Sequence, residues 1–446
     1  MQEKFKNSLS NLYSWLDTRV ADGGYNGFVL HRYDSRRVLL NNPTCWAQGP
    51  IICGLVNLAK QSKEYEKKLK IATEYQMNLL DSKSGKYKFC GHEDDRFSSL
   101  IQCALANEGL VESYSYFKNI DNKFSVQILE VLNVNVDKYL MSLWNEEYGA
   151  FKFNEIDFYS KDGDRFVANM NVMFIYSLIL YSKLINSDKY KIYIDRVLEW
   201  LLTQQISSDN PLLDGGFTYQ QKVGIEPKMQ NPVVIYNGII AEYLSKIYQY
   251  RPNKEYKDSL IRLKKYLLNN YNKEVGAFYH DYKEDNFLEK PYFIAGASFA
   301  LKGLYELNLA IGEDNSEVLE MTILIIDKYQ YKNGGFRGFV GYGSKENRKG
   351  CCSTFEIWED VVPTVNWNAK MFEFLSSITT IERDKYKSNL SIVSWSFIYK
   401  ETEKKVFVLG MFPIKSLALL IYNKKKIKPI FAFSLLDIYK KMKGKA

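Results

Sequence analysis

A glycine-plus-aromatic corner recurs six times in the first 340 residues, and an apolar helical pattern follows each corner. The glycines at 24, 85, 149, 216, 276 and 335 are separated by 61, 64, 67, 60 and 59 residues. A nearly constant period indicates one supersecondary unit that stacks on copies of itself. Each glycine is expected to be the left-handed residue that stops a helix, with the next aromatic folded back over the helix end. The corners are Gly24-Tyr25, Gly85-Lys86-Tyr87, Gly149-Ala150-Phe151, Gly216-Phe217, Gly276-Ala277-Phe278 and Gly335-Phe336.

Two helical segments flank each corner, and their connections alternate in length. Long loops follow the odd segments and short links follow the even ones, and short links force neighbouring helices to run antiparallel. The even segments are more uniformly apolar and are expected to form an inner ring, with the odd segments outside. The predicted fold is all-α, an (α/α)6 toroid of six helical hairpins over residues 1–380. The expected helices are 3–18, 43–61 (opened by Pro43), 63–80, 97–117, 124–143, 166–185, 188–205, 232–248, 254–270, 291–312, 315–330 and 362–378.

Residues 381–446 differ in character from the rest of the chain. Short β-branched and aromatic runs at 390–399 and 405–411 predict strands, and 427–433 is a further candidate. A short basic amphipathic helix is expected at 435–443, where packing on the toroid is favoured over docking at a membrane surface. The sequence therefore predicts a small mixed α/β appendage whose role it leaves open.

Composition excludes several classes of protein. The six cysteines show neither a disulfide framework nor a Cys-x-x-Cys metal motif, so free thiols in a cytoplasmic protein are expected. The start of the chain lacks the apolar stretch of a signal peptide, and no uncharged run reaches the roughly 18 residues of a membrane span. The net charge of +8 is dispersed rather than striped, which argues against a nucleic-acid partner but suits an anionic substrate. The oligomeric state stays open.

Neither a metal ion nor a cofactor is expected. The chain has only three histidines, and Cys90-Gly-His92 would supply two ligands without a clear third. No phosphate-binding Gly-x-x-x-x-Gly-Lys-Ser/Thr loop and no dinucleotide fingerprint occurs in the sequence. A Gly-x-Ser-x-Gly nucleophile elbow is also lacking, so the chemistry should come from acids, arginines and aromatic side chains.

The best candidates lie where the inner helices begin. In a toroid, six helix N-termini converge on one rim, and their free N–H groups and dipoles attract anions. Two carboxylates that face each other across such a bowl suit sugar chemistry, one as proton donor and the other as base. The alternative for each aspartate is a helix cap with a local ion pair, and for the last loop a packed lid. The candidate catalytic acids are Asp95, Asp164, Glu356 and Asp360.

Other residues of the same rim are candidates for substrate binding. Arg96 and Arg165 could hold an anionic group of the substrate through two hydrogen bonds each. Tyr236, Trp358 and Trp367 could stack on sugar faces. A buried Asn237 must have a hydrogen-bond partner, which is either a ligand hydroxyl or a contact between helices. The remaining candidates are Arg36, Trp46, His92, Asn171, His280 and Asn368.

The corners and the apolar helices resemble the α/α-toroid superfamilies, over about residues 1–380. Cys45-Trp-Ala-Gln-Gly49 and Tyr236-Asn-Gly238 are similar to the Trp-x-x-Gly and Asn-Gly helix starts of six-hairpin glycosidases, polysaccharide lyases and sugar epimerases. This resemblance implies a hydrolase, lyase or epimerase that acts on an anionic or neutral glycan or glycoconjugate, for example in surface-polysaccharide metabolism.

A second resemblance is to terpenoid cyclases and protein prenyltransferases. Gln204-Gln205 ahead of Asp214-Gly-Gly-Phe217 is similar to their repeat. His92-Glu-Asp-Asp95 stands where class II cyclases have Asp-x-Asp-Asp, although His92 replaces the first aspartate. A cyclase would need a deep apolar cavity, and a non-catalytic binding toroid would lack a close carboxylate pair. Because one fold hosts many chemistries, these alternatives stay open.

Overall fold

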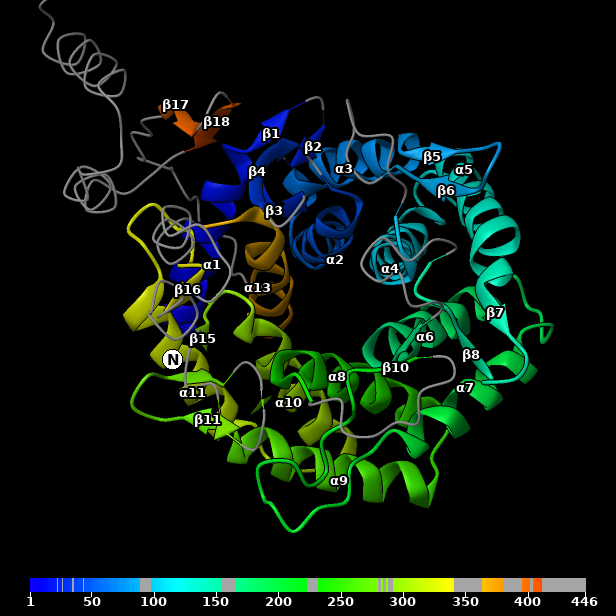
Figure 1. Ribbon diagram of the computed structural model, residues 1–446. Helices are drawn as coiled ribbons and strands as arrows, with labels where there is room; N and C mark the ends of the chain where they lie inside the picture. Colours follow the sequence, from blue (N-terminus) through cyan, green and yellow to red (C-terminus); the bar gives the residue numbers. More distant parts are fainter. Residues whose placement is uncertain are drawn as a thin grey trace, which may run out of the picture.

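In the residues that it describes, the computed structural model has twelve α-helices in two concentric rings around one axis, which Figure 1 views nearly end-on. Each hairpin joins an outer helix to the following inner helix, so the predicted (α/α)6 toroid is confirmed. Within the described part of the chain, no helix has both the length and the apolar character needed to cross a membrane. The structure describes residues 1–21, 23–25, 27–33, 36–42, 44–88, 98–154, 165–222, 232–279, 282–283, 286–287, 292–340, 363–379, 395–401 and 404–410.

The rings follow the amphipathic patterns of the sequence. Inner helix α6 buries every side chain from Ala168 to Ile179, whereas outer helix α9 buries only a stripe that includes Leu260 and Leu263. A helix that is apolar all round belongs in the interior, which explains the assignment of the rings. The outer helices are α1 (Gln2–Asp17), α3 (Glu66–Asn78), α5 (Asn122–Val134), α7 (Lys191–Thr203), α9 (Lys254–Asn269) and α11 (Ser316–Tyr329). The inner helices are α2 (Cys45–Gln61), α4 (Leu100–Phe117), α6 (Ala168–Leu184), α8 (Val234–Tyr250), α10 (Ala297–Ile311) and α13 (Val365–Ile378).

Two pairs of inner helices cross closely at glycines. A Cβ atom on Gly49 of α2 would lie 2.1 Å from the carbonyl oxygen of Leu105 in α4. A Cβ atom on Gly238 of α8 would lie 2.4 Å from Cα of Ala300 in α10. Only a residue without a side chain allows the backbones to approach this far.

The ring closes where the last hairpin meets the first. Asn57 of α2 donates to Ser376 of α13 at 3.1 Å, and Gln330 after α11 donates to the carbonyl of Ser8 in α1 at 2.9 Å. Figure 1 shows α13 and α11 beside α1, so the six hairpins form a closed circle. An open solenoid is thereby excluded.

Each corner is a small turn rather than a helix cap. The left-handed glycine of each corner lies several residues beyond the preceding outer helix, for example Gly85 (φ 77°) after α3 ends at Asn78. The expectation that glycine stops each helix is therefore wrong: glycine instead reverses the chain within the hairpin that follows, where only a positive φ fits. In every corner the residue two positions after this glycine is an aromatic at most 3% exposed. These aromatics are Tyr25, Tyr87, Phe151, Phe217, Phe278 and Phe336.

Four corners contain a two-stranded ladder, and the other two contain a single bridge. The bridges join Gln205 to Phe217 and Gln330 to Phe336. The ladders pair β1 (Val20–Ala21) with β2 (Gly24–Tyr25), β5 (Leu80–Asp81) with β6 (Lys86–Tyr87), β7 (Trp144–Asn145) with β8 (Ala150–Phe151), and β11 (Tyr271–Asn272) with β12 (Ala277–Phe278).

Several helices begin later or end earlier than predicted. Thr44 is extended (φ −110°, ψ 142°), so Pro43 does not open the first inner helix. The helix expected over 124–143 leaves α geometry after Val134, continuing as a π turn, η2 (Asn135–Tyr139), and a 3-10 turn, η3 (Leu140–Leu143). A further 3-10 turn, η1 (Lys63–Tyr65), precedes α3.

Short strands occupy parts of the long loops where the sequence predicted none. The residues just before α6 form β9 (Arg165–Val167), which pairs with β10 (Gln220–Lys222) and delays the start of the helix. Likewise β15 (Tyr292–Phe293) pairs with β16 (Phe339–Val340) ahead of α10. The first long loop is a hairpin of β3 (Gly27–Tyr33) and β4 (Arg36–Asn42), and β13 (Tyr282–Lys283) pairs with β14 (Asn286–Phe287).

The predicted C-terminal strands are present as a hairpin. It pairs β17 (Trp395–Glu401) with β18 (Lys404–Gly410) in antiparallel register, and it lies beside β4 (Figure 1). The further strand at 427–433 and the helix at 435–443 fall outside the described residues. The domain boundary at 380 also falls there and stays a prediction.

Candidate functional site

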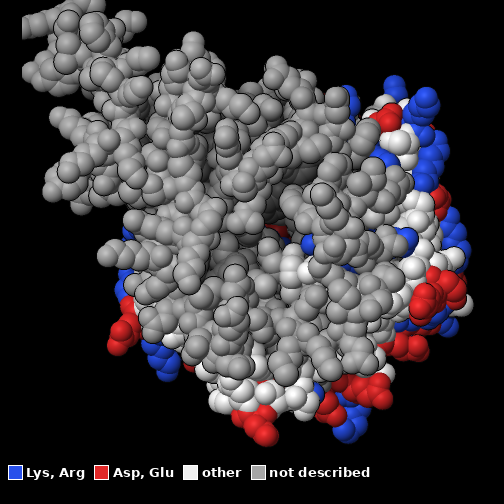
Figure 2. All heavy atoms as spheres, viewed as in Figure 1, with Lys and Arg blue, Asp and Glu red and all other residues white. Residues whose placement is uncertain are grey.

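The candidate site is the central hollow on the face that carries the long loops. All six inner helices begin on this face, because every long loop leads from an outer to an inner helix. Figure 2 shows the face hollowed at the centre of the ring, with charged atoms of both signs at the base of the hollow. The N-termini around the hollow contribute partial positive charge.

Six of the residues predicted from the sequence can be placed with their side chains: Arg165, Asn171, Tyr236, Asn237, Trp367 and Asn368. The backbones of Arg36, in β4, and Trp46, the second residue of α2, are described, but their side chains are not. The other candidates lie outside the described residues: Asp95, Asp164, Glu356, Asp360, His92, Arg96, His280 and Trp358.

Arg165 lies on the loop face just before α6, and only 8% of its surface is exposed. Its Nη1 donates to Oε1 of Gln220 at 3.2 Å, across the β9–β10 pair. Its guanidinium carbon lies 4.1 Å from the centre of the Phe153 ring, within the range of a cation–π contact. These contacts fix a positive charge near the start of an inner helix, where it reinforces the helix dipole.

Aromatic side chains line the start of three consecutive inner helices. Tyr236, the third residue of α8, stacks on Tyr219 with ring centres 5.2 Å apart. Trp367, the third residue of α13, lies 6.0 Å from Phe299, the third residue of α10, and 5.4 Å from Phe293. Aromatic rings thus stand at equivalent positions of α8, α10 and α13, where Tyr236 and Trp367 are partly exposed and Phe299 is buried.

The three predicted asparagines hold the corners in place. Asn237 accepts a hydrogen bond from the backbone N–H of Phe217 at 2.7 Å and donates to its carbonyl at 3.2 Å. Asn171 binds Phe151 in the same way, and Asn368 binds Phe336.

Each of these asparagines is the fourth residue of its inner helix. The fourth residue of α2, Gln48, forms the same two hydrogen bonds with the backbone of Tyr25, both at 3.3 Å. For Asn237 the partner is therefore the backbone of the corner, and neither the expected ligand hydroxyl nor the expected contact between helices. With both functions of the amide engaged by backbone, these residues are left out of the proposed site.

A layer of charged side chains closes the lumen below the rim. The ninth residues of α4, α8 and α13 are Glu108, Glu242 and Glu373, and oxygens of the three carboxylates lie within 4.8 Å of one another. Every second inner helix thus carries an acid at the same height. With a rise of 1.5 Å per residue, this height is about 12 Å below the first residue of each helix. The ninth residues of the other three inner helices are Cys53, Tyr176 and Tyr305.

Three lysines neutralise these acids. Lys246 lies 2.8 Å from Glu242 and 3.2 Å from Glu108. Lys370 lies 3.0 Å from Glu242 and 2.9 Å from Glu373. Lys302 lies 2.9 Å from Glu242 and also pairs with Glu373. We call these six side chains the charged ring: Glu108, Glu242, Glu373, Lys246, Lys302 and Lys370.

Within the charged ring, the neighbouring opposite charges favour the ionised forms of Glu242 and Lys246. Burial alone would raise the pKa of Glu242, but the three lysines outweigh it and hold that pKa well below the usual value. Burial would lower the pKa of Lys246, but Glu242 and Glu108 hold it well above the usual value. Because the ammonium groups lie between the carboxylates, they occupy the space that a metal ion would need. The ring is therefore a neutral floor to the hollow.

Sequence reasoning missed the charged ring, although a signal existed. Glu108, Glu242 and Glu373 are acids at one position of apolar inner helices, where a solvated role is excluded. Asn237 and Asn368 stand five residues before Glu242 and Glu373, so aligning α8 and α13 on these asparagines would have put the two acids in one layer.

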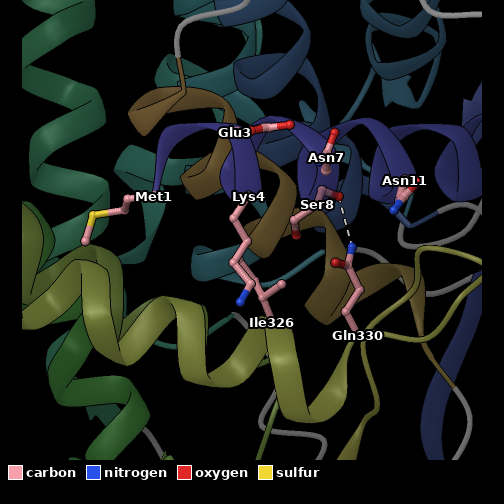
Figure 3. Close-up of a pocket in the computed structure, with 8 residues that line it drawn as sticks. All are labelled: Met1, Glu3, Lys4, Asn7, Ser8, Asn11, Ile326 and Gln330. Atoms are coloured by element: carbon pink, nitrogen blue, oxygen red, sulfur yellow. Dashed lines mark hydrogen bonds between the residues drawn. The ribbon is translucent and has the colours of Figure 1, made fainter.

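A second hollow lies outside the ring, at the seam between α1 and α11 (Figure 3). Its volume is about 400 Å³, and Gln330 crosses it to donate to the Ser8 carbonyl. It is formed by two outer helices and does not belong to the rim of the inner ring. The lining residues are Met1, Glu3, Lys4, Asn7, Ser8, Asn11, Ile326 and Gln330.

The chain matches no family model, and no curated protein matches it either. Its fold, however, is shared by solved carbohydrate-acting enzymes. A cellobiose 2-epimerase from Bacillus thermoamylovorans superposes with a TM-score of 0.63 at 13% identity, over 84% of this chain and 99% of the epimerase.

Two further enzymes superpose over 84% of this chain. An unsaturated glucuronyl hydrolase from a Bacillus species does so with a TM-score of 0.58 at 12% identity, over 96% of its own length. A GH76 α-mannanase from Bacteroides thetaiotaomicron does so with a TM-score of 0.59 at 11% identity, over 95% of its own length. At such identities the likeness establishes the six-hairpin toroid fold alone.

Proposed function

We propose that this chain is an enzyme that acts on a glycan or glycoconjugate by carboxylate acid/base chemistry in the loop-face hollow. The observation that carries the proposal is the make-up of the hollow's rim. The partly exposed rings of Tyr236 and Trp367 stand at the starts of α8 and α13, and an arginine bonded to Gln220 stands before α6. Sugars offer apolar faces for aromatic rings and hydroxyl groups for polar partners, so this combination suits them. The shared fold of the epimerase, the hydrolase and the mannanase supports the same class.

The acids come from three loops. Asp95 precedes α4, Asp164 precedes α6, and Glu356 and Asp360 precede α13. In the ring, α13 stands opposite α6, so acids of the last loop would face Asp164 across the hollow, with Asp95 between them. A separation of roughly 5–10 Å would serve two-carboxylate chemistry on a glycosidic centre. The more buried acid would donate a proton, because burial raises a carboxyl pKa, and the other would act as base.

An anionic group on the substrate is the finer part of the proposal. Arg165 offers a fixed guanidinium at the rim, and Arg96 follows Asp95 at the corresponding place in the preceding repeat. Guanidinium groups bind carboxylates through paired hydrogen bonds, so a uronic acid is the preferred sugar type. Hydrolysis, elimination and epimerisation all use this arrangement of acids.

We also propose a cytoplasmic location. Cys53 and Cys103 are buried free thiols, which supports a reducing compartment.

The test is a panel of probes offered to the intact protein. The panel contains an unsaturated glucuronyl disaccharide, cellobiose, mannose and a prenyl diphosphate, with binding measured by calorimetry and turnover by NMR of the sugar. The proposal predicts binding and turnover of at least one sugar. Binding of the prenyl diphosphate alone would favour a terpenoid or prenyl enzyme, and sugar binding without turnover would favour a binding toroid.

A further inference from the structure

Asn169 carries a buried oxygen without a hydrogen-bond donor. It is the second residue of α6, and only 2% of its surface is exposed. Within the described part of the chain, no group donates a hydrogen bond to its Oδ1. Buried polar atoms are nearly always paired, because a lone one has lost its contact with water and gained nothing in return. A donor from outside the chain would remove this cost.

The helical phase of α6 directs Asn169 into the lumen. Asn171 binds the corner at Phe151, outside the lumen. Asn169 lies two residues earlier, about 200° around the helix axis, and therefore points to the opposite side. Seven residues correspond to almost two full turns, so Asn169 shares its face with Tyr176. The Tyr176 ring lies 5.5 Å from that of Tyr243 and 5.1 Å from the Lys246 ammonium, at the charged ring.

Asn169 therefore lies above the charged ring, on the wall of the hollow. Seven residues of helix place it about 10 Å nearer to the loop face than Tyr176. Four residues earlier in the chain, Arg165 stands at the start of β9 on the same side of the ring. A ligand that rests on the charged ring and extends towards the loop face would contact Asn169 first and Arg165 next.

We infer that Oδ1 of Asn169 accepts a hydrogen bond from a hydroxyl group of the bound sugar. The inference rests on the proposed function and adds a residue that selects among sugars. An amide offers one acceptor and two donors, so Nδ2 of the same side chain can donate to the neighbouring hydroxyl. Two adjacent hydroxyl groups of a sugar ring match this pair. A sugar without the donating hydroxyl would leave Oδ1 unpaired and bind more weakly.

The experiment compares Asn169→Leu and Asn169→Asp with the wild type. Leucine has a similar size but offers no acceptor, whereas aspartate keeps an oxygen at the same place. Affinity is measured by calorimetry for the glucuronyl disaccharide, cellobiose and mannose, and Tm is measured without ligand. We expect Asn169→Leu to bind the wild type's sugar about tenfold more weakly or worse, with an unchanged or raised Tm. Asn169→Asp should retain more of the affinity than Asn169→Leu.

Three outcomes would count against the inference. Wild-type affinity in Asn169→Leu would show that Oδ1 does not contact the sugar, and the proposed function would stand. A Tm lowered by several degrees in Asn169→Leu would show that Oδ1 already has a partner within the protein. If the wild type binds none of the sugars, the proposed function fails, and this inference fails with it.

Discussion

The carboxylate of Glu242 in α8 lies 3.0 Å from the ammonium group of Lys370 in α13, although α10 stands between these helices in the ring. Glu242 also pairs with Lys246 and Lys302 and is fully buried. One carboxylate thus contacts three ammonium groups, of which those of Lys302 and Lys370 are buried. The stability of the toroid should depend on it strongly.

Glu242→Gln should destabilise the fold by about 3–5 kcal/mol, because it leaves the three lysines with only the carboxylates of Glu108 and Glu373 as counter-charge. The free energy of unfolding in urea measures the loss. The matched control is Glu320→Gln on outer helix α11, where the side chain is exposed and the change should stay within about 0.5 kcal/mol. Equal stability of the two variants would show that the charged ring contributes nothing at this position.

The lowered pKa of Glu242 predicts how the stability of the fold depends on pH. Its pKa is held well below 4.5 in the folded protein, so below pH 4.5 the unfolded chain binds the proton more readily. The contribution of Glu242 is therefore present above pH 4.5 and is lost as the pH falls towards the folded pKa. Acid unfolding of the wild type should show this slope, and Glu242→Gln should reduce it. An unchanged slope would contradict the assignment.

Alanine substitutions at two glycines with positive φ distinguish the backbone strain of an added side chain from its steric clash with neighbours. Gly215 (φ 85°) lies in a corner, where a Cβ would come 2.4 Å from the Arg262 carbonyl oxygen. Gly312 (φ 79°) follows α10 and has no atom within 4 Å of such a Cβ. Gly312→Ala should cost about 1–2 kcal/mol from backbone conformation alone. Thermal unfolding should show a clearly larger loss for Gly215→Ala; equal losses would mean that the corner can relax.

Arg165→Lys tests whether the substrate is anionic. Lysine keeps the charge but loses the planar guanidinium that bonds Gln220 and lies over Phe153. Affinity for the glucuronyl disaccharide should fall about tenfold, since a paired contact to the carboxylate is lost, while affinity for a neutral sugar should change little. Calorimetry with both sugars is the measurement. Equal losses for the two sugars would assign Arg165 a structural role.

The toroid could be predicted because its determinants are local and repeated. A left-handed glycine and a buried aromatic two residues later mark every corner, for example Gly276 and Phe278. Whether such a glycine ends the helix or turns the following hairpin could not be decided, since both positions favour a positive φ. The pairing of β9 with β10 was also missed, because neighbouring repeats contribute one short strand each.

The interior of the site could not be predicted in the same way. For Asn237 the sequence suggested a ligand hydroxyl or a contact between helices, whereas the fold shows that it binds the Phe217 backbone in the corner. Glu108 and Glu373 are far apart in the chain and meet only because the ring closes. An unpaired acceptor such as Asn169 Oδ1 is a property of packing that no spacing reveals.

The most direct measurement of the central claim is the turnover of Glu356→Gln and Asp95→Asn, each made separately, on the sugar that the wild type converts. Both variants should keep the wild-type Tm and lose at least about a hundredfold in kcat, as expected when a general acid or base is removed. Glu320→Gln on α11 should turn over at the wild-type rate. Wild-type rates in both active-site variants would contradict the account, and so would a stability loss above about 2 kcal/mol in both, which would identify these acids as helix caps and ion-pair partners.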